Sequence, residues 1–430
     1  MAPLALLRGP RPSGARRLPG RRTRGAGALG AVLLCLCLLR RACSADDPSS
    51  QRAPDVAFIK LGFEMVPLVG ALLLGFAIYA FRGASVMLET VAILLIYFGA
   101  QTGMNVYMKS VLSKIVVDAE EGLKGVPIGF MLTAIQQLVA FCIFCCFLVA
   151  GRLFNSGYQT RKLTTRREVI AVLCFSTAFA LNIGLNNFGL SLVAISINML
   201  IRSCLPLSTA VSQIAVGSIM GIEKKTSIAP LEWLLMLMGV GCAGLATYAK
   251  SAGSESSGES AELVLGVIVC VASIFSGALN MVLAGVLGSE MKLNPLDTTC
   301  YMSLPASLLL LVPALVVSHP MGTWPGFPSM TDWEVLREVV ARNPYALVPV
   351  LFSGVLSFVY NILQYTLVHK LSAAYAAFAG NFNKAATVAL SLLCGMEAVP
   401  SGQWGFIFIG AVVGNIAAFT AFSSLKVKKK

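Results

Sequence analysis

Long apolar segments, separated by short polar ones, fill the chain from residue 61 almost to its end. An apolar segment of about 20 residues is long enough for an α-helix to cross a hydrocarbon core of about 30 Å. Eleven such segments follow one another, at residues 61–81, 88–108, 126–150, 169–190, 193–217, 231–249, 263–287, 298–318, 345–368, 372–396 and 404–425. The pattern predicts an all-α polytopic membrane protein.

The composition excludes a soluble protein of this length. Of the 430 residues, 57% are hydrophobic and only 12% are charged, whereas about a quarter of the residues of a typical soluble domain are charged. The twelve cysteines lie in the first 45 residues or in and beside predicted spans. No ligand pattern surrounds them, so we expect neither a metal nor a cofactor. No nucleophile elbow, HExxH, P-loop or paired-carboxylate motif appears, and we therefore do not expect an enzyme.

The net charge of +13 is concentrated at the N-terminus, where residues 1–45 contain nine arginines and no acidic residue. An apolar run at 26–39 and small residues at 42–45 follow, before Asp46. This order is typical of a secretory signal peptide. An organelle transit peptide, or an uncleaved basic tail that binds nucleic acid or anionic lipid, shares the Arg-rich start. We interpret 1–45 as a targeting leader and expect no nucleic-acid partner.

The charges of the predicted loops alternate along the chain. Basic residues gather in the loops at 152–167, 224–225, 292 and 370 and in the tail at 426–430, whereas acidic residues gather at 118–121, 255–262, 332–338 and 397. The positive-inside rule places the basic set in the cytosol. The tail at 426–430 is then cytosolic, and residue 46 lies in the lumen, as a cleaved signal peptide requires.

Two stretches share a spaced motif, in which Gly-x-Glu precedes a Trp, a Gly six residues later and an aromatic residue nine further on. The motif falls at Gly221, Glu223, Trp233, Gly239 and Tyr248, and again at Gly395, Glu397, Trp404, Gly410 and Phe419. The two copies close helices on opposite sides of the membrane, which predicts two five-helix units of inverted topology, at 88–250 and 263–425. A polar lumenal linker at 251–262 joins them, and 46–87 is a lumenal segment with one extra transmembrane helix.

Two basic residues, Arg202 and Lys384, fall in the middle of predicted spans. A charged side chain there costs roughly 2.5–3.5 kcal/mol on insertion scales and is a functional candidate by default. With no acidic residue at comparable depth, they predict an anionic ligand, since a guanidinium group binds phosphate through two hydrogen bonds. The alternative is that each bonds backbone carbonyls or an amide. For Lys109, at a helix end, snorkelling to the interface is the alternative.

Amide, hydroxyl and aromatic side chains on the spans suit a ribose, a sugar or a base in a water-filled pocket. They include Gln101, Thr102, Asn105, Gln136, Gln137, Asn182, Asn186, Asn187, Asn280, Tyr301, Ser303, Tyr360, Asn361 and Gln364. Each could equally join two membrane helices, so the collection, rather than any one residue, favours a transport pathway.

Three blocks resemble the nucleotide-sugar and triose-phosphate translocator branch of the drug/metabolite transporter superfamily, over residues 88–425. They are Tyr97-Phe98 with Asn105-x-x-x-Lys109, the run from Ser196 through Arg202 to Pro206, and Gly380-Asn381-x-Asn383-Lys384. The resemblance implies that the basic residues contact substrate phosphates. The candidate substrate-binding residues are Arg202, Lys384, Lys109, Asn105, Asn198, Asn280, Tyr301, Tyr360, Asn361, Gly380, Asn381 and Asn383.

Two departures from the family patterns bear on the substrate. Lys384 is followed by Ala385 where phosphate translocators carry Arg, and Cys300-Tyr301-Met302-Ser303 stands where GDP-mannose carriers have an aromatic-Tyr-Asn-Asn block. The resemblance implies a secondary-active antiporter of phosphorylated organic anions in the Golgi or endoplasmic reticulum, with nucleotide sugar exchanged for nucleoside monophosphate by alternating access.

Other interpretations stay open. One is a plastid-type triose-phosphate or phosphoenolpyruvate–phosphate translocator, and another is a membrane receptor or scaffold without transport activity. The expected partners are a nucleotide sugar or sugar phosphate, the counter-substrate phosphate anion and the lipid bilayer, and a homodimer is left open. Lys426 and Lys428 resemble a dilysine retrieval signal, or form a plain basic flank of the last helix.

Overall fold

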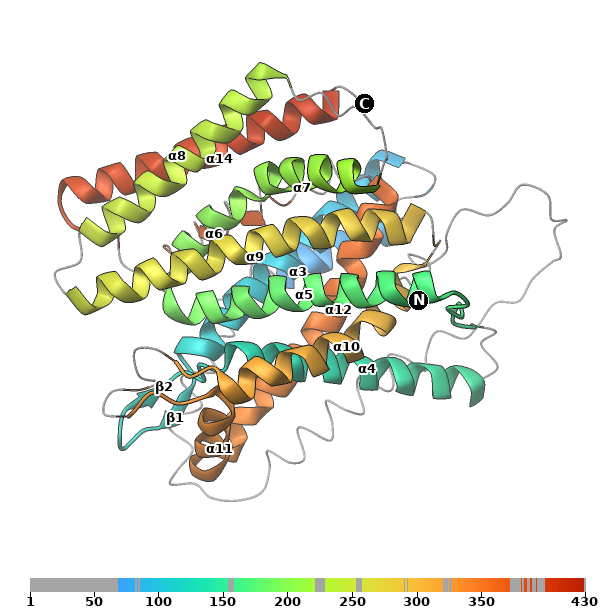
Figure 1. Ribbon diagram of the computed structural model, residues 1–430, viewed down its shortest axis with the longest axis horizontal. Helices are drawn as coiled ribbons and strands as arrows, with labels where there is room; N and C mark the ends of the chain where they lie inside the picture. The colour runs from blue at the N-terminus through green and yellow to red at the C-terminus, as the bar shows by residue number, and fades with distance from the viewer. Residues whose placement is uncertain are drawn as a thin grey trace, which may run out of the picture.

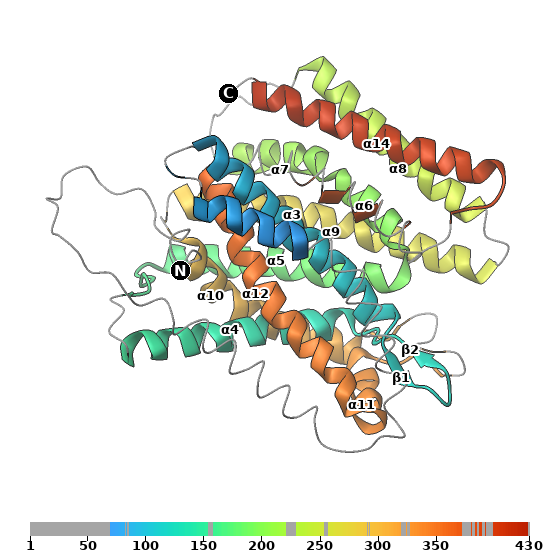
Figure 2. The same ribbon diagram turned by 180° about the vertical axis from the view of Figure 1, so that it is seen from behind.

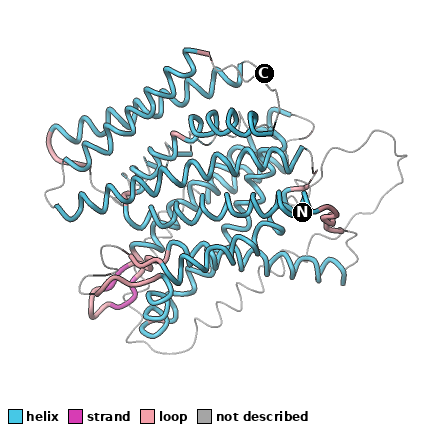
Figure 3. Tube along the Cα trace, viewed as in Figure 1, coloured by secondary structure: helices cyan, strands magenta, loops and turns pink. Residues whose placement is uncertain are grey.

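The computed structural model describes residues 69–81, 83, 86–153, 158–220, 229–252, 257–289, 291, 293–319, 324, 327–371, 380, 383–384, 387–388, 392 and 399–428. Helices make up nearly all of this part of the chain (Figure 3). The predicted leader at 1–45, most of 46–87, most of the predicted span at 372–396 and the last two residues lie outside the described residues.

Nine helical segments of the described part are long and apolar enough to cross a membrane, which confirms the prediction of an all-α polytopic membrane protein. The helices are α3 (Val86–Ser113), α4 (Gly129–Leu153), α5 (Arg166–Leu192), α6 (Ile195–Ser203), α7 (Leu205–Met220), α8 (Pro230–Ala252), α9 (Ser257–Ser289), α10 (Pro295–Val316), α11 (Asp332–Arg342), α12 (Leu347–Leu371) and α14 (Gln403–Lys428), with a 3₁₀ turn η2 (Pro344–Ala346). The span predicted at 61–81 is described only as a shorter apolar helix at Val69–Phe81.

The span predicted at 193–217 is found as a membrane-spanning segment over Ile195–Ser212, but its helix is interrupted at Cys204, between α6 and α7. Pro206 explains the break, since proline has no N–H to bond the carbonyl four residues earlier and its ring collides with that turn. At the break, the Cys204 N–H donates to the Ile201 carbonyl, three residues earlier, at 3.0 Å. The break leaves Arg202 in the last turn of a short helix.

The helices pack in pairs that join the first half of the chain to the second. α5 lies along α9, α3 along α12, α4 along α10 and α8 along α14. The α8–α14 pair forms one edge of the molecule and α4 with α10 lies toward the opposite edge (Figure 1). The view from behind shows α3 close to α12 (Figure 2). Every one of these pairs therefore crosses between the two predicted five-helix units.

One end of the bundle carries α11 and a two-stranded antiparallel hairpin, β1 (Val116–Asp118) and β2 (Leu123–Lys124), and we call it the hairpin end (Figure 1). The sequence places 332–338 in a loop, but these residues begin α11. The helix starts with a capping box, in which the Thr331 side chain accepts from the Glu334 N–H and the Glu334 side chain accepts from the Thr331 N–H.

Asp332 attaches α11 to the first half of the chain. Its Oδ2 accepts hydrogen bonds from the backbone N–H groups of Phe130 and Met131, both at 2.8 Å, and so caps the N-terminus of α4. Its Oδ1 lies 3.0 Å from Nε2 of His319. A carboxylate at a helix N-terminus is favourable because it satisfies free N–H groups and faces the positive end of the helix dipole. We call these four residues the Asp332 network.

Arg342 joins the last turn of α11 to the hairpin. Its guanidinium group lies 3.0 Å from Asp118 Oδ2, 2.8 Å from Glu121 Oε2 and 3.5 Å from Glu338 Oε2. The backbone N–H groups of Glu121 and Glu120, together with Arg342, hold the pKa of Asp118 below its usual value. Hydrogen bonds to Glu121 and Asp118 raise the pKa of Arg342. The hairpin and α11 are thus linked by charge as well as by packing.

A second buried carboxylate, Asp297, lies at the opposite end, in the first turn of α10. Its Oδ1 accepts from the Tyr158 hydroxyl at 2.7 Å, and its Oδ2 accepts from the Arg161 N–H at 3.2 Å and from Asn294 Nδ2 at 2.9 Å. Burial and the hydrogen bond to Asp297 raise the pKa of Tyr158, so this hydroxyl keeps its proton and donates it to the bond. We call these residues the Asp297 network; it joins the segment after α4 to α10.

Candidate functional site

Arg202 is held inside the helix bundle with part of its hydrogen-bonding capacity unused. Its Nη2 donates to Asn182 Oδ1 across 3.5 Å, a long contact. Its Nη1 is buried and has no hydrogen-bond partner in the described part of the chain. A buried donor without a partner loses its hydration and gains nothing in return, and the cost is larger for a charged group. Among the described residues, Arg202 therefore has a buried donor for which no acceptor is provided.

Two tyrosines lie within electrostatic range of Arg202, Tyr97 on α3 and Tyr360 on α12. Their rings are stacked, with centroids 6.2 Å apart and planes inclined by 17°. Tyr360 also lies close to Gln101. Asn383 Nδ2 in turn donates to Gln101 Oε1. Two predicted site residues, Tyr360 and Asn383, thus belong to one polar cluster beside Arg202.

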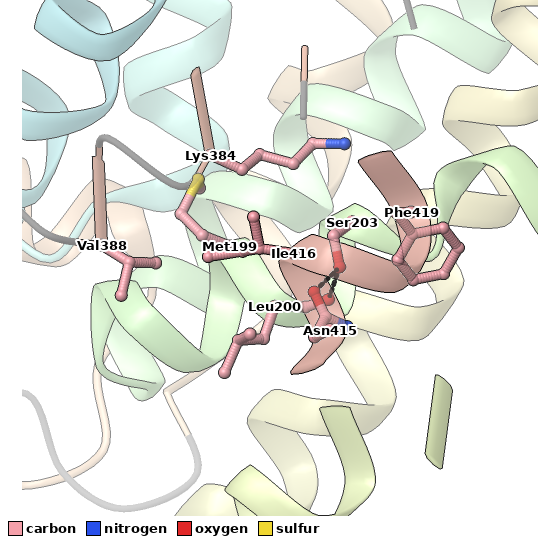
Figure 4. Close-up of a pocket in the computed structure, with 8 residues that line it drawn as sticks. All are labelled: Met199, Leu200, Ser203, Lys384, Val388, Asn415, Ile416 and Phe419. Carbon is pink, nitrogen blue, oxygen red and sulfur yellow. Dashed lines mark hydrogen bonds between the residues drawn. The ribbon is translucent and has the colours of Figure 1, made fainter. Parts of the chain in front are cut away.

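Lys384 lines a small pocket beside α6 (Figure 4). The pocket has a volume of about 10 Å³, which is about the space of one water molecule. Its lining residues are Met199, Leu200, Ser203, Lys384, Val388, Asn415, Ile416 and Phe419. Lys384 is within electrostatic range of Arg202. Two positive charges in a low-dielectric interior repel each other, so an anion between them is favoured.

The polar wall of this pocket is well ordered by hydrogen bonds between helices. Ser203 Oγ donates to Asn415 Oδ1 at 2.6 Å, as the dashed line in Figure 4 marks. Asn415 Nδ2 donates to the Gly239 carbonyl at 2.7 Å. α6, α14 and α8 are therefore joined next to the two basic side chains. The sequence prediction did not include Ser203 or Asn415, although a buried amide on a membrane helix is itself a signal.

Three further candidates lie around α6, and their side-chain nitrogens contact backbone carbonyls or sulfur atoms of neighbouring residues. Lys109 Nζ donates to the carbonyls of Leu190 at 2.8 Å and Val193 at 3.0 Å, and so caps the C-terminus of α5. Asn105 Nδ2 lies 3.6 Å from the Met199 sulfur. Asn198 is fully buried and its Nδ2 lies 3.2 Å from the Cys270 sulfur. Its Oδ1 has no partner in the described part of the chain.

The remaining candidates are distributed more widely. Asn280 and Asn361 each bury a side-chain nitrogen that has no hydrogen-bond partner among the described residues. Gly380 is buried, and Asn381 lies outside the described residues. The Tyr301 hydroxyl donates to the Arg161 carbonyl at 2.5 Å, which places Tyr301 beside the Asp297 network rather than beside Arg202.

No group of three or more His, Cys, Asp or Glu side chains that could hold a metal ion occurs among the residues that the structure describes. The two basic residues and the surrounding amides and hydroxyls are donors suited to an anion with many acceptor oxygens. A phosphate group fits this description, because it offers several oxygens and at least one negative charge.

Comparison with known proteins finds a distant similarity to a transporter. No protein-family model matches the chain. A probable sugar phosphate/phosphate translocator of Arabidopsis thaliana is 24% identical over 236 residues, which cover 54% of this chain and 67% of that protein. This distant similarity supports the resemblance to the drug/metabolite transporter superfamily, at the level of the superfamily. A solved structure described only as a crystal structure of a protein is 14% identical, covers 78% of this chain and 98% of its own, and has a TM-score of 0.41; a score this low does not establish a shared fold.

Proposed function

We propose that this membrane protein is a secondary transporter that exchanges phosphorylated organic anions, with Arg202 and Lys384 binding the phosphate. The observation that carries the proposal is the Arg202 guanidinium group, whose buried Nη1 has no hydrogen-bond partner among the residues that the structure describes and which lies in electrostatic range of a second positive charge. A phosphate ester supplies the acceptor that Nη1 lacks and reduces the repulsion between the two cations. We leave Lys109 and Tyr301 outside the phosphate site because their hydrogen bonds are made to backbone carbonyls elsewhere.

Within this class we propose that a nucleotide sugar is exchanged for a nucleoside monophosphate. The stacked Tyr97 and Tyr360 beside Arg202 support this choice, since aromatic rings and amides suit a base and a sugar. A second candidate is exchange of a sugar phosphate for inorganic phosphate, which the name of the Arabidopsis relative favours. A transporter of either kind is not an enzyme, since the substrate leaves unchanged.

The proposed mechanism rests on two inverted units, 88–250 and 263–425, that rock about the site. The packing supports this division, because exchanging the units maps the α5–α9 pair onto the α12–α3 pair and maps the α4–α10 and α8–α14 pairs onto themselves. Repulsion between Arg202 and Lys384 disfavours closure of the empty carrier, whereas a bound anion permits it. Exchange then follows from the difference in stability between the loaded and empty closed forms.

For the location, we propose a Golgi or endoplasmic reticulum membrane, with the hairpin end in the lumen. The charge difference between the loops supports the orientation, since Arg161, Arg166 and Arg167 lie at the other end and the acidic residues 118–121 lie at the hairpin end. A plastid-type membrane is the alternative for the sugar phosphate/phosphate candidate.

Exchange in proteoliposomes tests the function. Vesicles with purified protein are loaded with UMP, GMP, CMP or inorganic phosphate and supplied outside with labelled nucleotide sugars or sugar phosphates. We expect counterflow of one substrate pair, and loss of that counterflow in Arg202→Ala. Arg167→Ala, which removes the same charge at an exposed position, is the control and keeps the wild-type rate. If neither nucleotide sugars nor sugar phosphates show counterflow with any of the loaded anions, the proposed function is wrong.

A further inference from the structure

Asn182 on α5 lies between Arg202 and α9. Its side chain is 8% exposed, and its Oδ1 accepts the long hydrogen bond from Arg202 Nη2 at 3.5 Å. Ser273 on α9 donates its hydroxyl to the Asn182 carbonyl at 2.7 Å and lies 3.5 Å from Oδ1. Ser273 therefore joins the backbone of α5 at Asn182 to α9, and the side-chain amide of Asn182 lies between this hydroxyl and the guanidinium group.

Gly277 on α9 leaves the space that this amide occupies. A Cβ at position 277 would lie 2.7 Å from Asn182 Oδ1 and 3.0 Å from its Cγ. Such distances are too short for atoms that are not bonded, so any larger residue at 277 displaces the amide. α9 thus supplies a hydroxyl at Ser273 and, one turn further on, a glycine that lets the Asn182 side chain pack against its backbone.

We propose that Asn182 is a positioning residue for Arg202, which holds Nη2 so that Nη1 is presented to the phosphate of the substrate. The proposal rests on the function proposed above. An amide suits this role because its oxygen orients the guanidinium group without neutralising it. A carboxylate in the same place would form an ion pair with Arg202 and compete with the phosphate. Asn182 therefore orients the guanidinium group of Arg202 and leaves the positive charge of the site intact.

A double-mutant cycle tests this geometry without any transport measurement. Asn182→Asp places a carboxylate next to the guanidinium group, so we expect a higher unfolding temperature of the ligand-free protein. In the Arg202→Met background the same substitution buries a lone carboxylate, and we expect a lower unfolding temperature. If Asn182→Asp has the same effect in both backgrounds, the two side chains do not interact and the proposal is overturned.

Transport kinetics test the role in binding. For the anion that gives wild-type counterflow, we expect Asn182→Asp to raise KM by at least about tenfold, since the new carboxylate competes for the charge that binds phosphate, with a smaller change in the maximal rate. Gly277→Ala moves the amide without adding charge and raises KM less. The control is Gln403→Glu, which also changes an amide to a carboxylate but at an exposed position at the start of α14; its KM stays at the wild-type value.

Different results overturn the positioning role of Asn182 and the proposed transport function. A wild-type KM in Asn182→Asp, with wild-type counterflow present, overturns the positioning role and leaves the proposed function standing. Absence of counterflow in the wild-type protein, with the expected coupling in the double-mutant cycle, overturns the proposed function and leaves the contact between Asn182 and Arg202 standing.

Discussion

A positively charged side chain inside a membrane protein is unfavourable unless a partner or a function compensates for the lost hydration. Arg202 donates one long hydrogen bond to Asn182 Oδ1 and keeps Nη1 buried and without a partner in the described part of the chain. An unsatisfied buried donor costs roughly 1–3 kcal/mol, and more when it carries charge. Lys384 adds a second positive charge nearby. The two charges are costly inside the protein, and the proposed phosphate ligand would offset that cost.

Lys384→Ala is the residue-scale prediction. We expect it to abolish anion exchange, because it removes half of the positive charge of the site, and to leave the unfolding temperature within a few degrees of wild type. Lys384→Arg keeps the charge and retains part of the exchange. The measurement is counterflow in proteoliposomes beside thermal unfolding of the same preparation. Lys162→Ala, at an exposed position, serves as the control. Wild-type exchange in Lys384→Ala would contradict the assignment of the site.

Helix pairs carry the stability of the fold, and the α8–α14 pair has a particularly tight contact. A Cβ on Gly239 would lie 2.3 Å from the ring of Phe419, whereas a Cβ on Gly241 of the same helix would meet nothing within 4 Å. Gly239 also offers its carbonyl to Asn415. The glycine of the first copy of the repeated motif therefore serves close approach between the last helices of the two proposed units, whereas a Cβ on Gly410 of the second copy would meet nothing within 4 Å.

Gly239→Ala is accordingly expected to destabilise the protein by about 1–3 kcal/mol, the usual cost of an added methyl group in a packed interface. Gly241→Ala is the matched control and is expected to be neutral or stabilising, since alanine has the higher helix propensity by about 1 kcal/mol. Combining Gly239→Ala with Phe419→Leu should restore part of the stability. Thermal unfolding of the three variants provides the test, and equal unfolding temperatures for the two alanine variants would contradict the packing argument.

The spans were predictable because a membrane requires about 20 apolar residues in each helix, and the sequence contains them as separate runs. The break at Cys204 was not predicted, since residues on both sides of Pro206 are equally apolar. α11 carried a recognisable signal, the capping box of Thr331 and Glu334, within an acidic segment.

Arg202 and Lys384 were predictable as lone charges. Asn182 with Gly277, and Ser203 with Asn415, depend on packing between distant segments that no local pattern records.

At the scale of the whole molecule, two buried carboxylates join the two halves of the chain at opposite ends of the bundle. Asp332 caps α4 at the hairpin end, and Asp297 binds Tyr158 and the Arg161 N–H at the other end. Both networks are intact in this structure, and the pocket at Lys384 has a volume of only about 10 Å³. This pocket holds about one water molecule and is too small for a phosphate ester. Alternating access requires each end to separate in turn while the other stays joined.

The two networks should then act as gates, and Cys204 provides a native reporter, since it is buried and within electrostatic range of Lys384. In a variant that keeps Cys204 as its only cysteine, we expect slow labelling by a membrane-impermeant maleimide from either side. Asp332→Ala removes the cap of α4 and should speed labelling severalfold from the hairpin side. Asp297→Ala should do so from the other side. A saturating transported anion should slow both, because closure around the substrate covers the thiol. If both variants are labelled equally from the two sides, the carboxylates hold the fold together without gating it.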